Sequence, residues 1–195
     1  MPNTIKNLEN KPVNDKWYDD VFKKAVETPG GPINFVKHLK CLSQFCVGSV
    51  LDLGCGLGLL ADMVEGSYLG IDYSEYAIGY ARKTTKNIKA NFMRADLMEF
   101  IKSPILFDTI VLSEVLEHID FPAQLIRYAV DNYQKRLVAS VPINMPIKSH
   151  LKPVWLKEEI LNLFGNNPIY LEQGCRNLKG KNIHWHFVYE RKVEC

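Results

Sequence analysis

Between residues 50 and 141 the sequence alternates five short apolar runs with segments of helical periodicity. This alternation limits the fold more than any other feature of the chain. The expected strands are 50–53, 67–71, 90–94, 107–112 and 136–141, and the expected helices between them are 59–64, 75–85, 97–101 and 122–133. Apolar strands joined through helices build a parallel sheet that is covered on both faces. The sequence therefore predicts an α/β fold with a doubly wound sheet.

The segments on either side of this alternating region complete the expected architecture. Helices are expected over 17–28 and 33–46, after a polar arm over residues 1–16. After the fifth strand we expect a helix at 156–164 and strands at 169–172 and 184–190. No helical pattern separates these two strands, so a hairpin should make the last strand antiparallel to the rest. We expect one structural domain, with residues 1–46 as an N-terminal arm and helical cap and residues 47–195 as the sheet-bearing part.

The composition is that of an ordinary soluble globular protein. The 195 residues carry 24 basic and 22 acidic side chains, a net charge of +2, which gives no electrostatic argument for nucleic acid or an anionic membrane. The five cysteines are odd in number and form no CxxC pair, as in a reduced intracellular protein. No run approaches the roughly 18 apolar residues of a membrane span. We expect a cytoplasmic protein with no membrane partner.

A glycine-rich turn follows the first expected strand and marks a ligand site. Residues 50–61 read VLDLGCGLGLLA, with glycines at positions 54, 56 and 58. In doubly wound sheets the ligand lies beyond the carboxyl ends of the strands, and glycines there allow a close backbone approach. The dinucleotide fingerprint G-x-G-x-x-G needs a small residue where this chain has Leu59, and Asp52 is out of place beneath a pyrophosphate. A nucleotide-like ligand is therefore expected, and a nicotinamide dinucleotide is disfavoured.

The segment D-L-G-C-G-L-G resembles motif I of the class I S-adenosylmethionine-dependent methyltransferases. The resemblance continues through SYLGIDYSEYAIGYAR, FMRADLMEF and FDTIVLSEVLEHID, and covers residues 48–142 in order and spacing. It implies a Rossmann-like seven-stranded sheet in the order 3-2-1-4-5-7-6 with an N-terminal helical cap. It also implies S-adenosylmethionine as the cofactor.

The same resemblance implies roles for individual residues. Asp72 would accept hydrogen bonds from both ribose hydroxyls, and Asp96 from the adenine amine, with the Leu97 backbone N–H on the ring. The full set of expected cofactor contacts is Asp52, Gly54, Cys55, Gly56, Gly58, Asp72, Tyr73, Asp96, Leu97 and Ser113. Two local alternatives stay open, because Asp72 could cap the helix near Ser74 and Asp96 could cap the segment at 97–101.

The segment E-V-L-E-H after the fourth strand is expected to face the acceptor. On a helix, Glu114, Glu117 and His118 would share one face, and two carboxylates with an imidazole could ligate a divalent metal. The segment resembles E-x-x-E-H of ubiquinone-pathway O-methyltransferases and small-RNA 2′-O-methyltransferases, where it binds a metal. Similar segments occur in many small-molecule methyltransferases with no known metal role. We therefore expect no metal, keep these three residues as the candidate ligands, and expect His118 as a general base.

The region after the fifth strand should cover the acceptor. Three prolines between residues 142 and 153 indicate a loop, in which His150 is a second candidate base and metal ligand. His184 and His186 share one face of the last strand, and such a pair is more typical of a structural role. Asp120 is expected to cap the helix that begins at Pro122.

Aromatic residues of the two N-terminal helices are expected to form a lid or to pack on the sheet: Trp17, Tyr18, Phe22 and Phe35. The motifs of base-amine and cytosine C5 methylases are absent after the fourth and fifth strands, so nucleic acid is a disfavoured partner. We expect a methyltransferase acting on an O or N atom of a small molecule. The alternatives are a metal-dependent RNA 2′-O-methyltransferase and a non-catalytic relative that binds S-adenosylmethionine.

Overall fold

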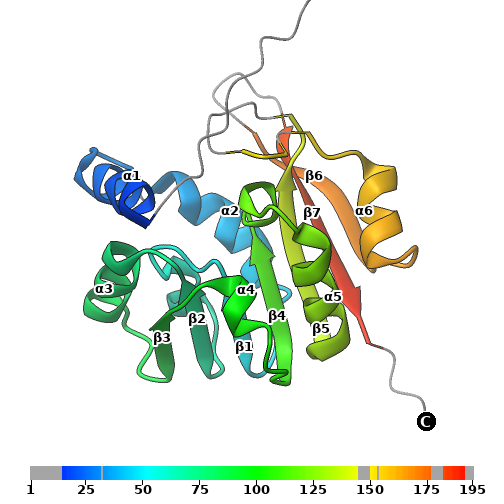
Figure 1. Ribbon diagram of the computed structural model, residues 1–195, viewed down its shortest axis with the longest axis horizontal. Helices are drawn as coiled ribbons and strands as arrows, with labels where there is room; N and C mark the ends of the chain where they lie inside the picture. The colour runs from blue at the N-terminus through cyan, green and yellow to red at the C-terminus, as the bar shows by residue number, and fades with distance from the viewer. Residues whose placement is uncertain (1–14, 32, 145–149, 153, 177–181, 192–195) are drawn as a thin grey trace, which may run out of the picture.

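The computed structural model describes residues 15–31, 33–144, 150–152, 154–176 and 182–191. The polar arm expected over residues 1–16 lies outside this range except for its last two residues. Seven strands form one sheet in the order β3-β2-β1-β4-β5-β7-β6 (Figure 1). Their bounds are β1 Val50–Leu53, β2 Tyr68–Asp72, β3 Ala90–Arg94, β4 Phe107–Ser113, β5 Tyr133–Pro142, β6 Tyr170–Arg176 and β7 Asn182–Glu190.

The strand order and strand directions confirm the expected topology. The pairs among β1 to β5 are parallel, whereas β7 is antiparallel to both β5 and β6. The direction in which successive strands are added to the sheet reverses between β1 and β4, which are parallel neighbours at its centre. A doubly wound sheet opens a crevice at this point, beyond the carboxyl ends of the two strands.

Helices cover both faces of the sheet. The longer ones are α1 Asp15–Glu27, α2 Ile33–Ser43, α3 Glu75–Thr84, α5 Pro122–Asn132 and α6 Lys157–Phe164, and the short ones are η1 Leu59–Met63, α4 Leu97–Phe100 and η2 Leu116–His118. Leu125 of α5 and Ile160 of α6 pack in one core cluster, while Leu42 of α2 and Ile78 of α3 pack in the other. Among the described residues, no helix has the length and apolar character needed to span a membrane.

The acid within β1 has a partner in the neighbouring strand. Successive residues of a strand point to opposite faces, so Leu51 packs in the first cluster while Val50 packs in the second. Asp52 points to the same face as Val50 and is 2% exposed. Its Oδ2 accepts a hydrogen bond of 2.5 Å from the hydroxyl of Tyr68 in β2. This pair explains how an otherwise apolar strand carries a carboxyl group.

Two local expectations differ from the structure. The segment expected as a helix at 59–64 is a single 3₁₀ helix, Leu59–Met63. The expectation that Asp120 caps the next long helix is wrong, because Phe121 occupies the N-cap position of α5 and its side chain makes no capping bond. Pro122 stands at the start of the helix, where its missing N–H leaves one fewer backbone donor without a helical partner.

Helix α1 is attached to the body of the protein through α3 (Figure 1). Asp19 Oδ1 accepts hydrogen bonds from the Ser74 hydroxyl at 2.5 Å and from the Tyr76 N–H at 3.0 Å. The Tyr76 N–H lies in the first turn of α3, where backbone N–H groups lack helical partners. A carboxylate at this position is also favoured by the helix dipole.

Candidate functional site

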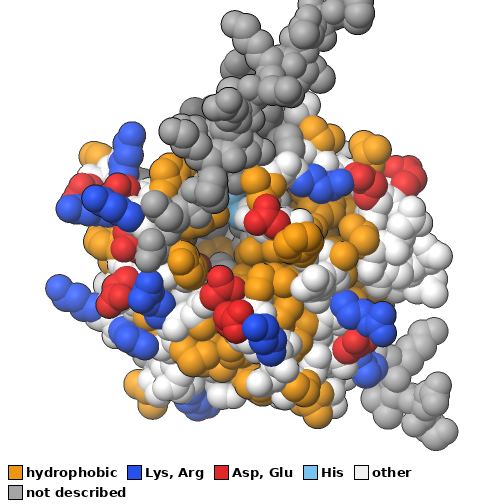
Figure 2. Space-filling model, viewed as in Figure 1, with side chains coloured by type: hydrophobic (Ala, Val, Ile, Leu, Met, Phe, Trp, Pro, Cys, Tyr) orange, Lys and Arg blue, Asp and Glu red, His pale blue; other side chains and the backbone are white. Residues whose placement is uncertain are grey.

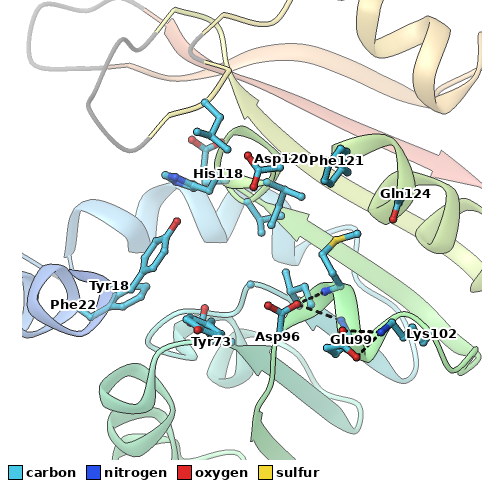
Figure 3. Close-up of a pocket in the computed structure, with 18 residues that line it drawn as sticks. Tyr18, Phe22, Tyr73, Asp96, Glu99, Lys102, His118, Asp120, Phe121 and Gln124 are labelled. Atoms are coloured by element: carbon cyan, nitrogen blue, oxygen red, sulfur yellow. Dashed lines mark hydrogen bonds and ion pairs between the residues drawn. The ribbon is translucent and has the colours of Figure 1, made fainter. Parts of the chain in front are cut away.

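A cavity of about 860 Å³ lies beyond the carboxyl ends of β1 to β4 (Figure 3). In Figure 2 this face is hollowed near its centre, with hydrophobic and acidic side chains around the hollow. The lining residues are Tyr18, Phe22, Gly54, Asp72, Tyr73, Asp96, Leu97, Met98, Glu99, Lys102, Glu114, Val115, His118, Ile119, Asp120, Phe121, Gln124 and Leu151. The volume falls within the roughly 300–1,000 Å³ of small-molecule sites.

The glycine turn gives the cavity a floor of bare backbone. Gly54 has φ 85°, a conformation that side chains disfavour, and a Cβ there would lie 2.7 Å from Val115. The N–H groups of Gly54 and Cys55 both donate to the Ile71 carbonyl, at 2.8 and 3.0 Å. The turn is thereby fixed to the end of β2, and it leaves room for a ligand to approach the main chain.

Asp72 connects the glycine turn to the start of α3. Its two oxygens accept from the N–H groups of Gly56 at 2.8 Å and of Ser74 at 2.9 Å. Ser74 itself caps α3 by accepting from the Ala77 N–H. Asp72 lines the cavity and is 9% exposed, and burial raises its pKa. Each carboxylate oxygen has capacity for a further hydrogen bond, which a pair of hydroxyls could supply.

Asp96 caps a helix and also lines the cavity, so its capping role is observed and its contact with adenine stays a prediction. Its Oδ1 accepts from the Met98 N–H at 2.7 Å and the Glu99 N–H at 3.2 Å, so it caps α4. The same side chain is exposed and lines the cavity beside Leu97 (Figure 3). Tyr73 lines the same side, with the Arg94 guanidinium 5.8 Å from its ring centre.

Five expected cofactor residues are not among the described residues that line the cavity: Asp52, Cys55, Gly56, Gly58 and Ser113. Asp52 is directed to Tyr68, and Ser113 Oγ lies 3.1 Å from the Nε2 of His38. Burial raises the pKa of Asp52 to about 7; the Tyr68 hydrogen bond opposes this rise and the charge of Asp72 adds to it. A cofactor role for these five residues stays a prediction.

The E-V-L-E-H segment does not form the expected helix face. Glu114 has φ 54° and its N–H donates to the Ser140 carbonyl, so the chain turns sharply before the short η2 helix. The two carboxylates face different histidines but stay close enough to interact with each other. Glu114 Oε2 lies 2.8 Å from His184 Nε2, whereas Glu117 Oε1 lies 4.0 Å from both His118 Nε2 and His150 Nε2.

Glu117, His118 and His150 form a compact group at the acceptor end of the cavity. One ligand atom of each lies within 4.8 Å of the others, a spacing that could hold a metal ion. The N–H groups of Leu151 and Lys152 donate to the Glu117 carbonyl, which fixes the His150 segment beside η2. Burial and the charge of Glu114 raise the pKa of Glu117 well above its usual range.

An aromatic wall closes the cavity on the side of α1. Tyr18 and Phe22 point into it, and the Tyr18 hydroxyl is directed toward His118 (Figure 3). The two rings meet edge-to-face with their centres 6.0 Å apart. Burial, with the charges of Asp72 and Glu117, raises the pKa of Tyr18 to about 12. Tyr18 therefore stays neutral and can donate a hydrogen bond.

Sequence reasoning did not find several residues of the wall opposite α1. Asp120, Phe121 and Gln124 line the cavity from the turn before α5 and its first helical turn. The only sequence signal was their position after the fourth strand. His38, which bonds to Ser113, was also missed, because nothing in its neighbourhood distinguishes it from other residues of an amphipathic helix.

The proteins found to be similar to this chain are methyltransferases. A model of the methyltransferase domain matches residues 50–136. The ubiquinone biosynthesis O-methyltransferase of Hydrogenovibrio crunogenus is 27% identical over 75% of this chain, and that of Coxiella burnetii is 31% identical over 58%. The chain spans 64% and 51% of the lengths of these two relatives.

Solved structures with the same fold are more distant in sequence. The magnesium protoporphyrin IX methyltransferase of Synechocystis PCC 6803, with bound S-adenosylhomocysteine, has a TM-score of 0.69 at 15% identity, over 89% of this chain and 94% of that one. The N-methyltransferase NodS of Bradyrhizobium japonicum has a TM-score of 0.68 at 17% identity, over 90% and 99%. The matched methyltransferase domain model, the strand order and the glycine turn together show that this chain resembles S-adenosylmethionine-dependent methyltransferases and shares their fold.

Proposed function

We propose that the chain is an enzyme that moves a methyl group from S-adenosylmethionine to an oxygen or nitrogen atom of a small-molecule acceptor. One observation carries the proposal: two chemically different halves meet in a single cavity. The cofactor half consists of Gly54, Asp72, Tyr73, Asp96 and Leu97. The acceptor half consists of Tyr18, Phe22, His118 and Phe121, with Glu117 and His150 behind His118.

The cofactor half fits S-adenosylmethionine. That molecule contains a ribose diol, an adenine amine and an ammonium group but no phosphate, so it needs carboxylates and close backbone contact. Asp72 offers accepting capacity at the floor of the cavity, and Asp96 offers it at the edge. The glycine turn provides the close approach, because Gly54 lines the cavity with main-chain atoms and carries no side chain.

The acceptor half fits a flat, mostly apolar molecule with one ionisable hydroxyl or amine. Bound S-adenosylmethionine supplies a methyl group on a sulfonium, which a nucleophile aligned with the carbon–sulfur bond can take. Tyr18, Phe22 and Phe121 would hold the body of the acceptor and exclude water. His118 would accept the proton that the acceptor loses as its new bond to carbon forms.

A divalent cation at Glu117, His118 and His150 is a second candidate for the acceptor half. The 4.0 Å separations exceed hydrogen-bond length, and neither carboxylate oxygen of Glu117 has a hydrogen-bond partner among the described residues. A bound cation would offset the cost of this buried carboxylate and lower the pKa of an acceptor hydroxyl. Turnover measured with and without a chelator tests the cation: activity that a chelator leaves unchanged would refute it.

The first experiment is a calorimetric titration of the protein with S-adenosylhomocysteine, beside NADH as a control. We expect micromolar affinity for the first ligand and none for the second. Acceptor screening would follow, with formation of S-adenosylhomocysteine as the readout. This readout is needed because the fold alone does not show methyl transfer. The [4+2]-cyclase SpnF has the same fold, with a TM-score of 0.61 at 16% identity. Binding of NADH alone would overturn the proposal.

A further inference from the structure

A second group of histidines lies below the cavity, on the face of the sheet that α2 covers. We call His38 of α2 and His184 and His186 of β7 the three-histidine cluster. All three are buried, with 6%, 8% and 1% of their surfaces exposed. None of them lines the cavity among the described residues. The methyl-transfer proposal assigns them no role.

The sheet register explains how the cluster is assembled. Ser113 of β4 pairs with Ser140 of β5, and Ser140 pairs with His186 of β7, so these side chains form one row across the sheet. His38 reaches this row from α2. His184 lies two residues from His186 on the same face of β7.

The imidazole nitrogens converge. His38 Nδ1 and His186 Nε2 lie 3.0 Å apart. His184 completes a set in which one nitrogen of each ring lies within 4.8 Å of the other two. A tetrahedral zinc ion with bonds of about 2.0–2.1 Å holds its ligand nitrogens about 3.3 Å apart. Small ring movements would therefore bring the three nitrogens to ligand positions.

The outer contacts of the rings are those that metal-binding histidines use. The Nε2 of His38 is bonded to the hydroxyls of Ser140 at 2.9 Å and Ser113 at 3.1 Å, which leaves Nδ1 directed at His186. His184 Nε2 is bonded to the Glu114 carboxylate at 2.8 Å. Hydrogen bonds from the second nitrogen to a carboxylate or hydroxyl orient such ligands and raise their basicity.

Two further observations indicate that the cluster is built for an occupant. The Nδ1 of His184 is buried and has no hydrogen-bond partner among the described residues, which a stable interior avoids. A Cβ on Gly174 of β6 would lie 2.6 Å from the His186 ring. The glycine therefore leaves the space that this ring occupies.

We propose that His38, His184 and His186 bind one divalent transition-metal ion, with zinc as the best chemical match. Three neutral imidazoles suit zinc, copper, nickel and cobalt, and they disfavour magnesium and calcium, which prefer oxygen ligands. The buried Glu114 carboxylate beside His184 offsets part of the charge of the ion. The site is distinct from Glu117, His118 and His150, and it does not depend on methyl transfer.

The metal would clamp two distant parts of the chain. His38 belongs to the N-terminal cap, whereas His184 and His186 belong to the last strand. The ion would hold α2 against the sheet directly beneath Glu114, a residue that lines the cavity. Its role is structural, since substrate is not in contact with the cluster.

The test uses the full chain, stripped with a chelator and then titrated with Zn²⁺ or Co²⁺ alone. We expect one tightly bound ion at the cluster. The Co²⁺ absorption spectrum should be that of a four-coordinate ion with three nitrogen ligands. His38→Gln and His186→Gln should each weaken this binding by more than about 100-fold, the upper end of what losing an outer contact costs. Ser140→Ala, which keeps all three ligands, should weaken it by about tenfold.

His150→Gln is the matched control, because it removes a buried histidine from the other group. It should leave the tight site intact. Loss of the tight site in His150→Gln, with retention in His38→Gln, would assign the metal to Glu117, His118 and His150 and overturn the proposal. Absence of tight binding by the wild-type chain would also overturn it.

X-ray absorption keeps the test decisive if the cluster variants do not fold. The measurement uses the His150→Gln protein loaded with one equivalent of Zn²⁺, in which the other group retains a single histidine. Three imidazole ligands at about 2.0–2.1 Å would support the cluster. Fewer imidazoles, or sulfur ligands, would refute it.

Discussion

The two halves of the cavity are built in different ways. In the cofactor half, Gly54, Asp72 and Asp96 each lie at the end of a strand or within two residues of it, and their hydrogen bonds are made with backbone N–H groups or with the carbonyl of a neighbouring strand. In the acceptor half, Tyr18, His118 and His150 come from α1, η2 and the segment after β5, and they meet through ring contacts.

This difference has a chemical consequence. The cofactor half is held by main-chain geometry, which changes little when one exposed side chain is replaced. The acceptor half depends on which side chains happen to meet across elements, so substitutions there can change the acceptor without disturbing the cofactor. The predictions below separate the two halves, in order of decreasing expected effect.

His118→Gln should affect the acceptor half alone. Loss of a general base lowers kcat by about 10²- to 10⁴-fold. The affinity for S-adenosylhomocysteine should stay close to that of the wild type, because His118 lies across the cavity from Tyr73 and Asp96 (Figure 3). Steady-state kinetics and calorimetry check the two halves separately. An equal loss in kcat and in cofactor affinity would contradict the division.

Asp72→Ala should affect mainly the cofactor half. It removes the predicted ribose contacts and frees the N–H groups of Gly56 and Ser74, so S-adenosylhomocysteine binding should weaken by about 2–4 kcal/mol. Calorimetry measures the loss. The exposed Asp131, which pairs with Arg127 at the surface, provides the control Asp131→Ala, whose affinity should equal that of the wild type. Unchanged affinity in Asp72→Ala would refute the ribose assignment.

Asp52→Asn tests whether the acid of β1 belongs to the site or to the sheet. The folded-state pKa of Asp52, about 7, lies above its unfolded value of 3.8, so the folded protein binds this proton more tightly. Stability from this group is present at low pH and declines as pH rises through 7, by an order of 2 kcal/mol between pH 5 and pH 8.

Asparagine can still accept the Tyr68 hydrogen bond, but its amide does not ionise. The variant should therefore keep the contact and lose this pH dependence. Urea unfolding of the two proteins at several pH values gives the difference directly. The same variant titrated with S-adenosylhomocysteine reports on the site. Two results together would place Asp52 in the cofactor half instead of the sheet. The difference in unfolding free energy between wild type and variant would not change with pH, and the variant would bind S-adenosylhomocysteine more weakly.

Asp19→Ala should produce the smallest loss of stability and activity. It acts at the contact between α1, which carries the aromatic wall, and the start of α3. It leaves the first turn of α3 without its carboxylate partner, at a cost of about 1 kcal/mol. We expect faster proteolysis within α1 and a raised KM for the acceptor. The neighbouring exposed Asp20 provides the control, and Asp20→Ala should match the wild type in both. Identical behaviour of the two variants would show that Asp19 does not hold the aromatic wall.

The sequence predicts the sheet almost completely, because its strands and crossover helices are local patterns. Strand order, the antiparallel last strand and the limits of β1 and β3 all agree with expectation. Half of the ten expected cofactor residues line the cavity, because they lie at the carboxyl ends of the strands: Gly54, Asp72, Tyr73, Asp96 and Leu97. Asp96 also caps α4, as one of the two sequence alternatives predicted, and its contact with adenine stays a prediction.

The acceptor half could not be predicted in the same way. The left-handed conformation of Glu114 breaks the helix that would have given it one face with Glu117 and His118, and spacing along a sequence carries no information about such a turn. Asp120 was expected to cap α5 but lines the cavity. His38 meets its partners only through the packing of α2 against the sheet, a contact that no local pattern encodes.

The position of β7 has a consequence for how the chain assembles. This strand is the last in sequence, yet it lies inside the sheet between β5 and β6. Its residue His186 meets His38 across 148 positions of sequence. Contacts of such long range form late, because closing the intervening loop is entropically unfavourable. During synthesis on the ribosome, α2 therefore emerges well before β7, and until β7 is in place β5 is an open edge that could pair with another chain.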